Sequence, residues 1–227
     1  MSKLNFTYGL ATTKGSERKV NEDSVIALTW SDVPRFSEQD VGLFIVADGM
    51  GRDESGLRAS QLAVQIVSQE IENYLSEQTD LNINEAMTKS FQEANQRIVD
   101  DPYGGTTLTA ALLVGNQVYI AHVGDSRLYF INDNTITPLT NDHSLITRYI
   151  QIIDPITPED YEEPPPSRVL FRAPGQSETV EVDFRSEQVT PNTQLLLCTD
   201  GLISLDSPLT QADLLPIIRI NKPQKGL

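Results

Sequence analysis

The chain has very little cysteine and little basic charge. Its one cysteine, Cys198, has no partner for an internal disulfide, and its place in the apolar run 195–199 indicates core packing rather than a nucleophile. The 17 Lys and Arg residues are outnumbered by 32 Asp and Glu residues, which gives a formal net charge of −15. Such a chain repels phosphate backbones and anionic lipids, so neither nucleic acid nor a membrane surface is an expected partner.

Long hydrophobic runs are also missing. No apolar stretch reaches the length of a transmembrane helix, and residues 1–15 lack the apolar centre of a signal peptide. These absences predict a cytoplasmic protein. The 227 residues, 39% of them apolar, are enough for a single domain with its own core. The acidic excess either solubilises the surface or includes carboxylates grouped to bind cations, and composition leaves both explanations open.

Short strands and amphipathic helices alternate along the chain. Apolar residues at helical spacing predict helices over 59–75 and 87–98, and Asn82 with Glu85 resembles a capping box before the second. A short helix is predicted at 209–218, and the acidic, proline-rich residues 151–166 predict a long surface loop. Strand patterns cover 6–10, 25–30, 41–47, 107–114, 117–123, 127–131, 135–139 and 193–199. The sequence therefore predicts an α+β fold of antiparallel sheets with helices packed outside.

Acidic residues recur where these apolar strands begin or end. A carboxylate at a strand end is held by the core and still reaches solvent, and a neighbouring glycine lets the backbone approach a ligand. Hard divalent cations prefer such oxygen ligands, and two cations about 4 Å apart are used to hydrolyse phosphate esters. Asp-Gly is also a common turn dipeptide, which would explain any one motif alone. The acids together, which favour a shared site, are Glu22, Asp23, Asp48, Asp125 and Asp200.

Six motifs in order resemble the metal-dependent protein phosphatases of the protein phosphatase 2C (PPM) family, from about residue 5 to residue 205. The Asp48-Gly49-Met50-Gly51 motif is similar to the bacterial branch. The other motifs are Arg18 with Asn21-Glu22-Asp23-Ser24, Gly105-Thr106-Thr107, Gly124-Asp125-Ser126-Arg127, Asp142-His143-Ser144 and Thr199-Asp200-Gly201-Leu202. The resemblance implies a four-layer α-β-β-α sandwich in which two antiparallel sheets are flanked by helical pairs.

The resemblance also implies a reaction and roles for individual residues. Phosphoserine and phosphothreonine in proteins would be hydrolysed by water activated between two Mn²⁺ or Mg²⁺ ions. Asp48 would bridge both ions, and Arg18 would bind the substrate phosphate with its planar guanidinium group. Catalysis is assigned to Asp48, Asp200 and Arg18, and the substrate is expected to be a Ser/Thr kinase or one of its targets. The implied metal ligands are Glu22, Asp48, Gly49 through its carbonyl, Asp200, and Asp125 for a third, weaker site, with Asp23 as support.

Two departures from the family pattern bear on activity. Bacterial relatives read Gly-His where this chain has Arg52 and Asp53, and an ionised Asp53 cannot donate a proton to a leaving group. In the family that the sequence resembles, an Asp-Asn pair and a closing strand come after the motif that matches Asp200. No Asp-Asn pair follows Asp200 here, so residues 1–227 are expected to be a single phosphatase-like domain lacking that motif and its closing strand. The two histidines are predicted to be structural, His122 in the core and His143 as a hydrogen-bonded residue near a flap loop.

The sequence is also compatible with two alternatives to an active phosphatase. One is a catalytically impaired phosphatase-like module that binds phosphoproteins or a regulatory partner. The other is an acidic Ca²⁺-binding β protein, which leaves Arg18 without a role. The flap, residues 145–176, corresponds to a family segment that tunes substrate choice. Its residues Tyr161, Glu162 and Glu163 predict that acidic phosphosites are disfavoured and basic ones tolerated.

Overall fold

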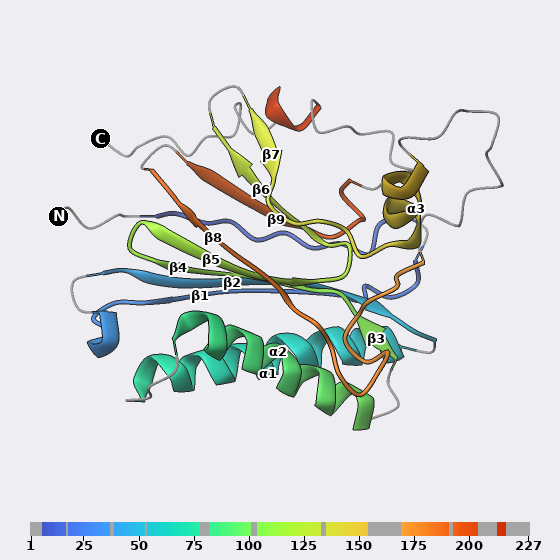
Figure 1. Ribbon diagram of the computed structural model, residues 1–227, viewed down its shortest axis with the longest axis horizontal. Helices are drawn as coiled ribbons and strands as arrows, with labels where there is room; N and C mark the ends of the chain where they lie inside the picture. The colour runs from blue at the N-terminus through green and yellow to red at the C-terminus, as the bar shows by residue number, and fades with distance from the viewer. Residues whose placement is uncertain are drawn as a thin grey trace.

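Two antiparallel sheets organise this protein in the computed structural model (Figure 1). The structure describes residues 6–16, 18–36, 39–52, 54–77, 82–100, 104–132, 135–153, 169–190, 193–203 and 213–216. Its elements are β1 (Asp23–Trp30), the 3-10 helix η1 (Pro34–Phe36), β2 (Val41–Met50), α1 (Ser55–Ser76), α2 (Ile83–Asp100), β3 (Gly105–Thr106), β4 (Leu108–Val114), β5 (Gln117–Val123), β6 (Arg127–Ile131), β7 (Ile136–Pro138), α3 (Leu145–Ile153), β8 (Asp183–Gln188) and β9 (Gln194–Cys198). The larger sheet has the order β1-β2-β4-β5-β8 with β3 added on β2, and the smaller has the order β7-β6-β9.

Strand β2 lies at the centre of the larger sheet and is covered on both faces. Side chains alternate along a strand, so Leu43 and Ile45 join the core shared with α1 and α2, whereas Phe44 packs in the core between the two sheets. This double burial explains why residues 41–47 are apolar without alternation. The strand therefore delivers Asp48 from a rigid base.

The two long helices cover the outer face of the larger sheet (Figure 1). The predicted capping box precedes α2: the backbone N–H of Glu85 donates to Asn82 Oδ1 at 3.0 Å, and that of Asn82 donates to Glu85 Oε2 at 3.0 Å. On the smaller sheet, a helical turn at 213–216 buries Leu214 against Tyr129 and Ile131 of β6. The predicted α+β sandwich of two antiparallel sheets is confirmed.

Three local predictions need correction. Residues 6–16 contain no strand, although Phe6 and Tyr8 pack edge-on against Phe44 at ring-centroid distances of 6.0 and 5.7 Å. The predicted loop from residue 151 begins inside α3, and strand β8 was not predicted. Within the predicted 209–218 helix the structure describes 213–216, and the flap's residues 154–168 lie outside the described residues.

Candidate active site

Asp48 stands where β2 leaves the core, directly opposite another aspartate. In the antiparallel register of β1 and β2, Asp23 pairs with Asp48. Because residues directly opposite in an antiparallel pair lie close together, the charge of Asp23 opposes ionisation of the Asp48 carboxyl group. Burial raises the pKa of Asp48 to about 9, and the charges of Asp23, Asp200 and Asp125 add to that rise.

Asp200 and Asp125 reach the same place from two other strand ends. Asp200 follows β9, and it contributes to the raised pKa of Asp48, of Asp23 and of Asp125. Asp125 lies between β5 and β6, and its pKa is raised to about 7 by burial first and then by the charges of Asp200 and Asp142. The structure thus gathers Asp23, Asp48, Asp125 and Asp200, which are far apart in the sequence, into one acidic cluster.

Residues before β1 form the rim of this cluster. Arg18 Nη1 lies 3.7 Å from Glu22 Oε2, and 67% of the Arg18 side chain is exposed against 16% of the Glu22 side chain. Glu22 is in turn close enough to Asp23 for its charge to raise that residue's pKa, after the larger effects of burial and of Asp200. The hydroxyl of Thr199 donates a 2.9 Å hydrogen bond to Asp23 Oδ2, which ties the start of β1 to the end of β9.

Glycine is required where α1 packs against the end of β2. A Cβ atom on Gly49 would lie 2.1 Å from the carbonyl oxygen of Gly56, and one on Gly56 would lie 2.7 Å from Glu22 Oε1. The backbone N–H of Gly49 also donates to the carbonyl oxygen of Glu22 at 3.1 Å. This contact holds the β2 end, the residues before β1 and the start of α1 together.

The backbone of Asp48 is fixed by two threonines. Its N–H donates to Thr107 Oγ1 at 2.8 Å, and its carbonyl oxygen accepts from the Thr107 N–H at 2.8 Å and from the Thr106 hydroxyl at 2.9 Å. Thr107 Oγ1 also hydrogen-bonds the hydroxyl of Ser126 at 2.6 Å, beside Asp125. All three hydroxyl residues are buried, so these bonds are protected from water.

Sequence reasoning identified the carboxylates but gave no role to Thr107, Ser126, Thr199 or Gly56. The first three stand in the motifs Gly105-Thr106-Thr107, Gly124-Asp125-Ser126-Arg127 and Thr199-Asp200-Gly201-Leu202. Their place in these motifs is the sequence signal that could have identified them. The role of Gly56 depends on a contact between distant segments. Arg52 is exposed, and Asp53 lies outside the described residues.

Both histidines are structural, as the sequence predicted. His122 is buried, with Nδ1 2.8 Å from Thr109 Oγ1 and Nε2 3.0 Å from the carbonyl oxygen of Asn141. Burial lowers its pKa to about 3, so the ring stays neutral. His143 accepts a 3.0 Å hydrogen bond from the Gly124 N–H at Nδ1, and its Nε2 lies 3.1 Å from Asp183 Oδ2.

The chemistry of the cluster suits hard divalent cations. Its side-chain ligands are carboxylate oxygens. Burial first, and then repulsion between neighbouring carboxylates, raises the pKa values of Asp48 and Asp125, and a bound cation would relieve that repulsion. In the arrangement described, no group of three or more Asp, Glu, His or Cys side chains among the described residues is placed so that it could hold a metal ion. Metal binding would therefore require these carboxylate side chains to reorient.

Fold and site together define an α+β sandwich protein with a carboxylate centre suited to divalent cations. The chain belongs to the protein phosphatase 2C family, whose sequence model matches residues 21–221. It is 37% identical over 180 residues to the serine/threonine phosphatase Stp of Listeria welshimeri, a match that covers 76% of this chain and 71% of the relative. It is 31% identical over 173 residues to the protein phosphatase PhpP of Streptococcus pneumoniae, covering 73% and 69% of the two chains.

Solved structures agree with this assignment. The serine/threonine phosphatase of Streptococcus agalactiae superposes with a TM-score of 0.75 at 27% identity, over 94% of this chain and 86% of that one. The Mycobacterium tuberculosis phosphatase PstP superposes with a TM-score of 0.72 at 27% identity, over 93% and 84%. The catalytic domain of PstP in complex with two manganese ions gives a TM-score of 0.70 at 27% identity, over 92% and 82%.

Proposed function

We propose that the acidic cluster is the metal and phosphate site of a serine/threonine protein phosphatase. The family match, the relatives' names and the PstP structure with two manganese ions make the chain a metal-dependent protein serine/threonine phosphatase that uses Mn²⁺ or Mg²⁺. Its substrates are phosphoproteins. The observation that carries the proposed site is the meeting of three strand ends: Asp23 pairs with Asp48 in the β1–β2 register, and Thr199, the neighbour of Asp200, donates a 2.9 Å hydrogen bond to Asp23.

Each predicted residue has a proposed task. Asp48 and Asp200 would hold the ions together with Glu22 and the carbonyl of Gly49, and Asp125 with Asp200 would hold a weaker third ion. When bound, the divalent cations supply Lewis-acid activation of water and neutralise phosphate charge. Asp23 accepts a hydrogen bond from the Thr199 hydroxyl and would support the start of β1 without contacting substrate.

Arg18 is the proposed phosphate-binding residue. The Arg18 side chain is mostly exposed, and its 3.7 Å contact with Glu22 places it at the rim of the cluster. This one contact leaves other N–H groups of the guanidinium group able to donate to a phosphate. A guanidinium group binds two phosphate oxygens at once, which would orient the phosphorus atom over the carboxylates. Glu22 would compete for the same donors in the free enzyme.

The physiological setting is a further part of the proposal. We expect the substrate to be a Ser/Thr kinase or one of its targets, and the cytoplasm to be the place of action. No helix among the described residues is long and apolar enough to cross a membrane. The catalytically impaired alternative is tested by the same assay as the active enzyme.

The decisive experiment compares the wild-type chain with Asp48→Asn. We expect Mn²⁺-dependent hydrolysis of p-nitrophenyl phosphate and of phosphothreonine peptides by the wild type, and a loss of at least about 100-fold in the variant, because one carboxylate serves both ions. Titration calorimetry with Mn²⁺ should show weaker binding to Asp48→Asn and unchanged binding to Glu178→Gln, an exposed control. Metal binding without turnover in the wild type would support the impaired module, and equal turnover in both proteins would reject Asp48 as a ligand.

A further inference from the structure

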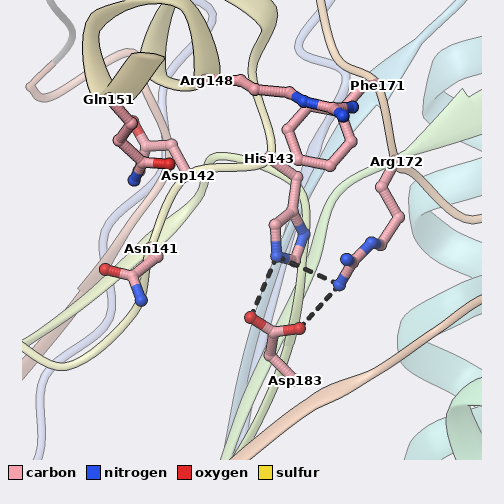
Figure 2. Close-up of a pocket in the computed structure, with 8 residues that line it drawn as sticks. All are labelled: Asn141, Asp142, His143, Arg148, Gln151, Phe171, Arg172 and Asp183. Atoms are coloured by element: carbon pink, nitrogen blue, oxygen red, sulfur yellow. Dashed lines mark hydrogen bonds and ion pairs between the residues drawn. The ribbon is translucent and has the colours of Figure 1, made fainter.

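A polar cavity lies beside the acidic cluster. It has a volume of about 420 Å³ and is formed by α3, by the segment after β7, by residues 171–172 and by the start of β8 (Figure 2). Helix α3 contributes Arg148 and Gln151 to its wall, and Phe171 contributes an aromatic ring. None of these three residues has a task in the proposed metal or phosphate chemistry.

Most charges in this cavity are already paired. Arg172 Nη1 contacts Asp183 Oδ1 at 2.6 Å, and its Nη2 contacts Glu181 Oε2 at 3.0 Å. Asp142 receives hydrogen bonds from Arg127 at 2.8 and 2.5 Å. These groups are therefore built into the wall and have little capacity left for a ligand.

Arg148 differs from the other charged residues of the cavity. Within the described part of the chain its side chain has neither an ion pair nor a hydrogen bond, and its guanidinium carbon lies 5.6 Å from the centre of the Phe171 ring (Figure 2). Stacking on an aromatic ring limits the rotamers of the guanidinium group and leaves its N–H groups free. Arg148 is thus a preorganised donor that has no acceptor among the described residues.

The cavity is joined to the acidic cluster by the loop that carries Asp125. The backbone N–H of His143 donates to the Gly124 carbonyl oxygen at 2.7 Å, and the backbone N–H of Gly124 donates to the ring nitrogen Nδ1 of His143 at 3.0 Å. The Phe171 N–H donates to the His143 carbonyl oxygen at 2.9 Å. His143 therefore contacts both Phe171 and Gly124, the residue before Asp125, and links the cavity to the loop of Asp125.

We propose that this cavity binds a carboxylate side chain, from an Asp or Glu of the phosphoprotein substrate close to its phosphorylated residue, with Arg148 as donor and Phe171 as platform. The proposal rests on the proposed function. One guanidinium group that is unpaired among the described residues complements one monoanion, whereas a second phosphate dianion would also face the carboxylates of Asp142 and Asp183. A lysine side chain would be repelled by Arg148.

The test is a positional scan of phosphothreonine peptides. Glu, Ala or Lys is placed at each of the four positions on either side of the phosphothreonine, and kcat/KM is measured relative to that for p-nitrophenyl phosphate. We expect Glu at one or two positions to raise kcat/KM about three- to tenfold over Ala, as a charge-assisted hydrogen bond at a partly exposed site would. Arg148→Ala should remove this preference, and Arg148→Glu should transfer it to Lys at the same positions.

A matched control separates local recognition from overall charge. Arg97→Ala removes one exposed positive charge on α2, on the other side of the larger sheet, and should keep the Glu preference. The proposal is overturned if no position favours Glu, if Lys is favoured instead, as Tyr161, Glu162 and Glu163 would predict, or if Arg148→Ala and Arg97→Ala change the preference equally. Absence of p-nitrophenyl phosphate hydrolysis in the wild type would instead count against the proposed function itself.

Discussion

Gly49 and Gly56 approach so closely that neither position has room for a side chain. A Cβ atom on Gly49 would lie 2.1 Å from the Gly56 carbonyl oxygen and 2.8 Å from that of Glu22, and all these atoms belong to the backbone. Backbone atoms cannot move aside as the end of a flexible side chain can. The contact joins the first turn of α1 to the strand end that carries Asp48, so the position of the carboxylate depends on it.

Gly49→Ala is therefore expected to damage both stability and activity. The added methyl group forces the start of α1 away from β2 and should lower the free energy of unfolding by about 2 kcal/mol. Metal-dependent turnover should fall more than folding alone explains, because Asp48 and Glu22 separate. Urea unfolding and p-nitrophenyl phosphate kinetics measure the two effects. Gly9→Ala is the control, since no atom lies within 4 Å of a Cβ at Gly9, and equal behaviour of the two variants would contradict this account.

The metal-free protein should lose stability as pH rises. The pKa of Asp48 is raised from 3.8 to about 9, so between these pH values the native state holds a proton that the unfolded state has released. The free energy of unfolding then falls with increasing pH, by at most about 1.4 kcal/mol per pH unit from this one group. Asp48→Asn cannot ionise and should flatten the decline.

The measurement is urea unfolding in EDTA at pH 5 to 8. At pH 8 the Asp48→Asn protein should be more stable than the wild type, although it is the less active enzyme. Added Mn²⁺ should stabilise the wild type and have little effect on the variant. A wild-type stability that rises from pH 5 to pH 8 in EDTA, with Asp48→Asn rising in parallel, would show that Asp48 is ionised in the metal-free fold.

The elements that the sequence predicted correctly have strong local signals. Strand β2 is apolar on both faces, and the α2 cap is formed within four residues. Strand β8 gave no such signal, because it is a polar edge strand whose Arg185 and Glu187 pair with each other on the surface. Helix α3 was missed because its isoleucines and threonine favour strands, although Ser144 accepts the Thr147 N–H at 3.3 Å at its start.

The candidate site was predictable to a different degree. Its carboxylates stand in short motifs at strand ends, so residue type and local position were available from the sequence. The convergence of Asp200 on Asp48 and Asp23 depends on how β9 lies relative to β1 and β2, which no local pattern specifies. The cavity around Arg148 was unpredictable for the same reason, because α3, β8 and residues 171–172 meet only in the folded chain.

Among the ion pairs of the described residues, Arg127–Asp142 is expected to contribute most to stability. Its side chains are only 15% and 10% exposed, and the contact is bidentate. Arg127→Met leaves Asp142 buried without a partner and should lower the free energy of unfolding by about 3 kcal/mol. Arg97→Met, which breaks the exposed pair with Glu93, should leave stability almost unchanged.

A double variant tests whether the cost comes from the unpaired charge. Arg127→Met combined with Asp142→Leu removes both charges and should recover much of the lost stability, measured by urea unfolding at neutral pH. If the double variant is as unstable as the sum of the two single variants, lost packing rather than an uncompensated carboxylate is responsible.

Thr107 should act on metal binding although its side chain is not a proposed ligand. Its hydroxyl accepts the Asp48 N–H and also bonds the Ser126 hydroxyl, so one oxygen atom holds the loops of Asp48 and Asp125 together. Thr107→Val keeps the shape but leaves the half-buried Asp48 N–H without its Thr107 acceptor, which should cost about 2 kcal/mol of stability. The Mn²⁺ concentration for half-maximal activity should rise several-fold, because Asp48 and Asp125 are no longer held in register.

Thr107→Ser separates the hydroxyl from the methyl group. The serine keeps the hydroxyl oxygen and loses the methyl group, Cγ2. This methyl group lies so close to Gly124 that a Cβ atom on Gly124 would be only 2.8 Å from it. This variant should be less stable than the wild type but should bind Mn²⁺ with nearly wild-type affinity in titration calorimetry. If Val and Ser at this position weaken Mn²⁺ binding equally, packing against Gly124 rather than the shared hydroxyl positions the two aspartates.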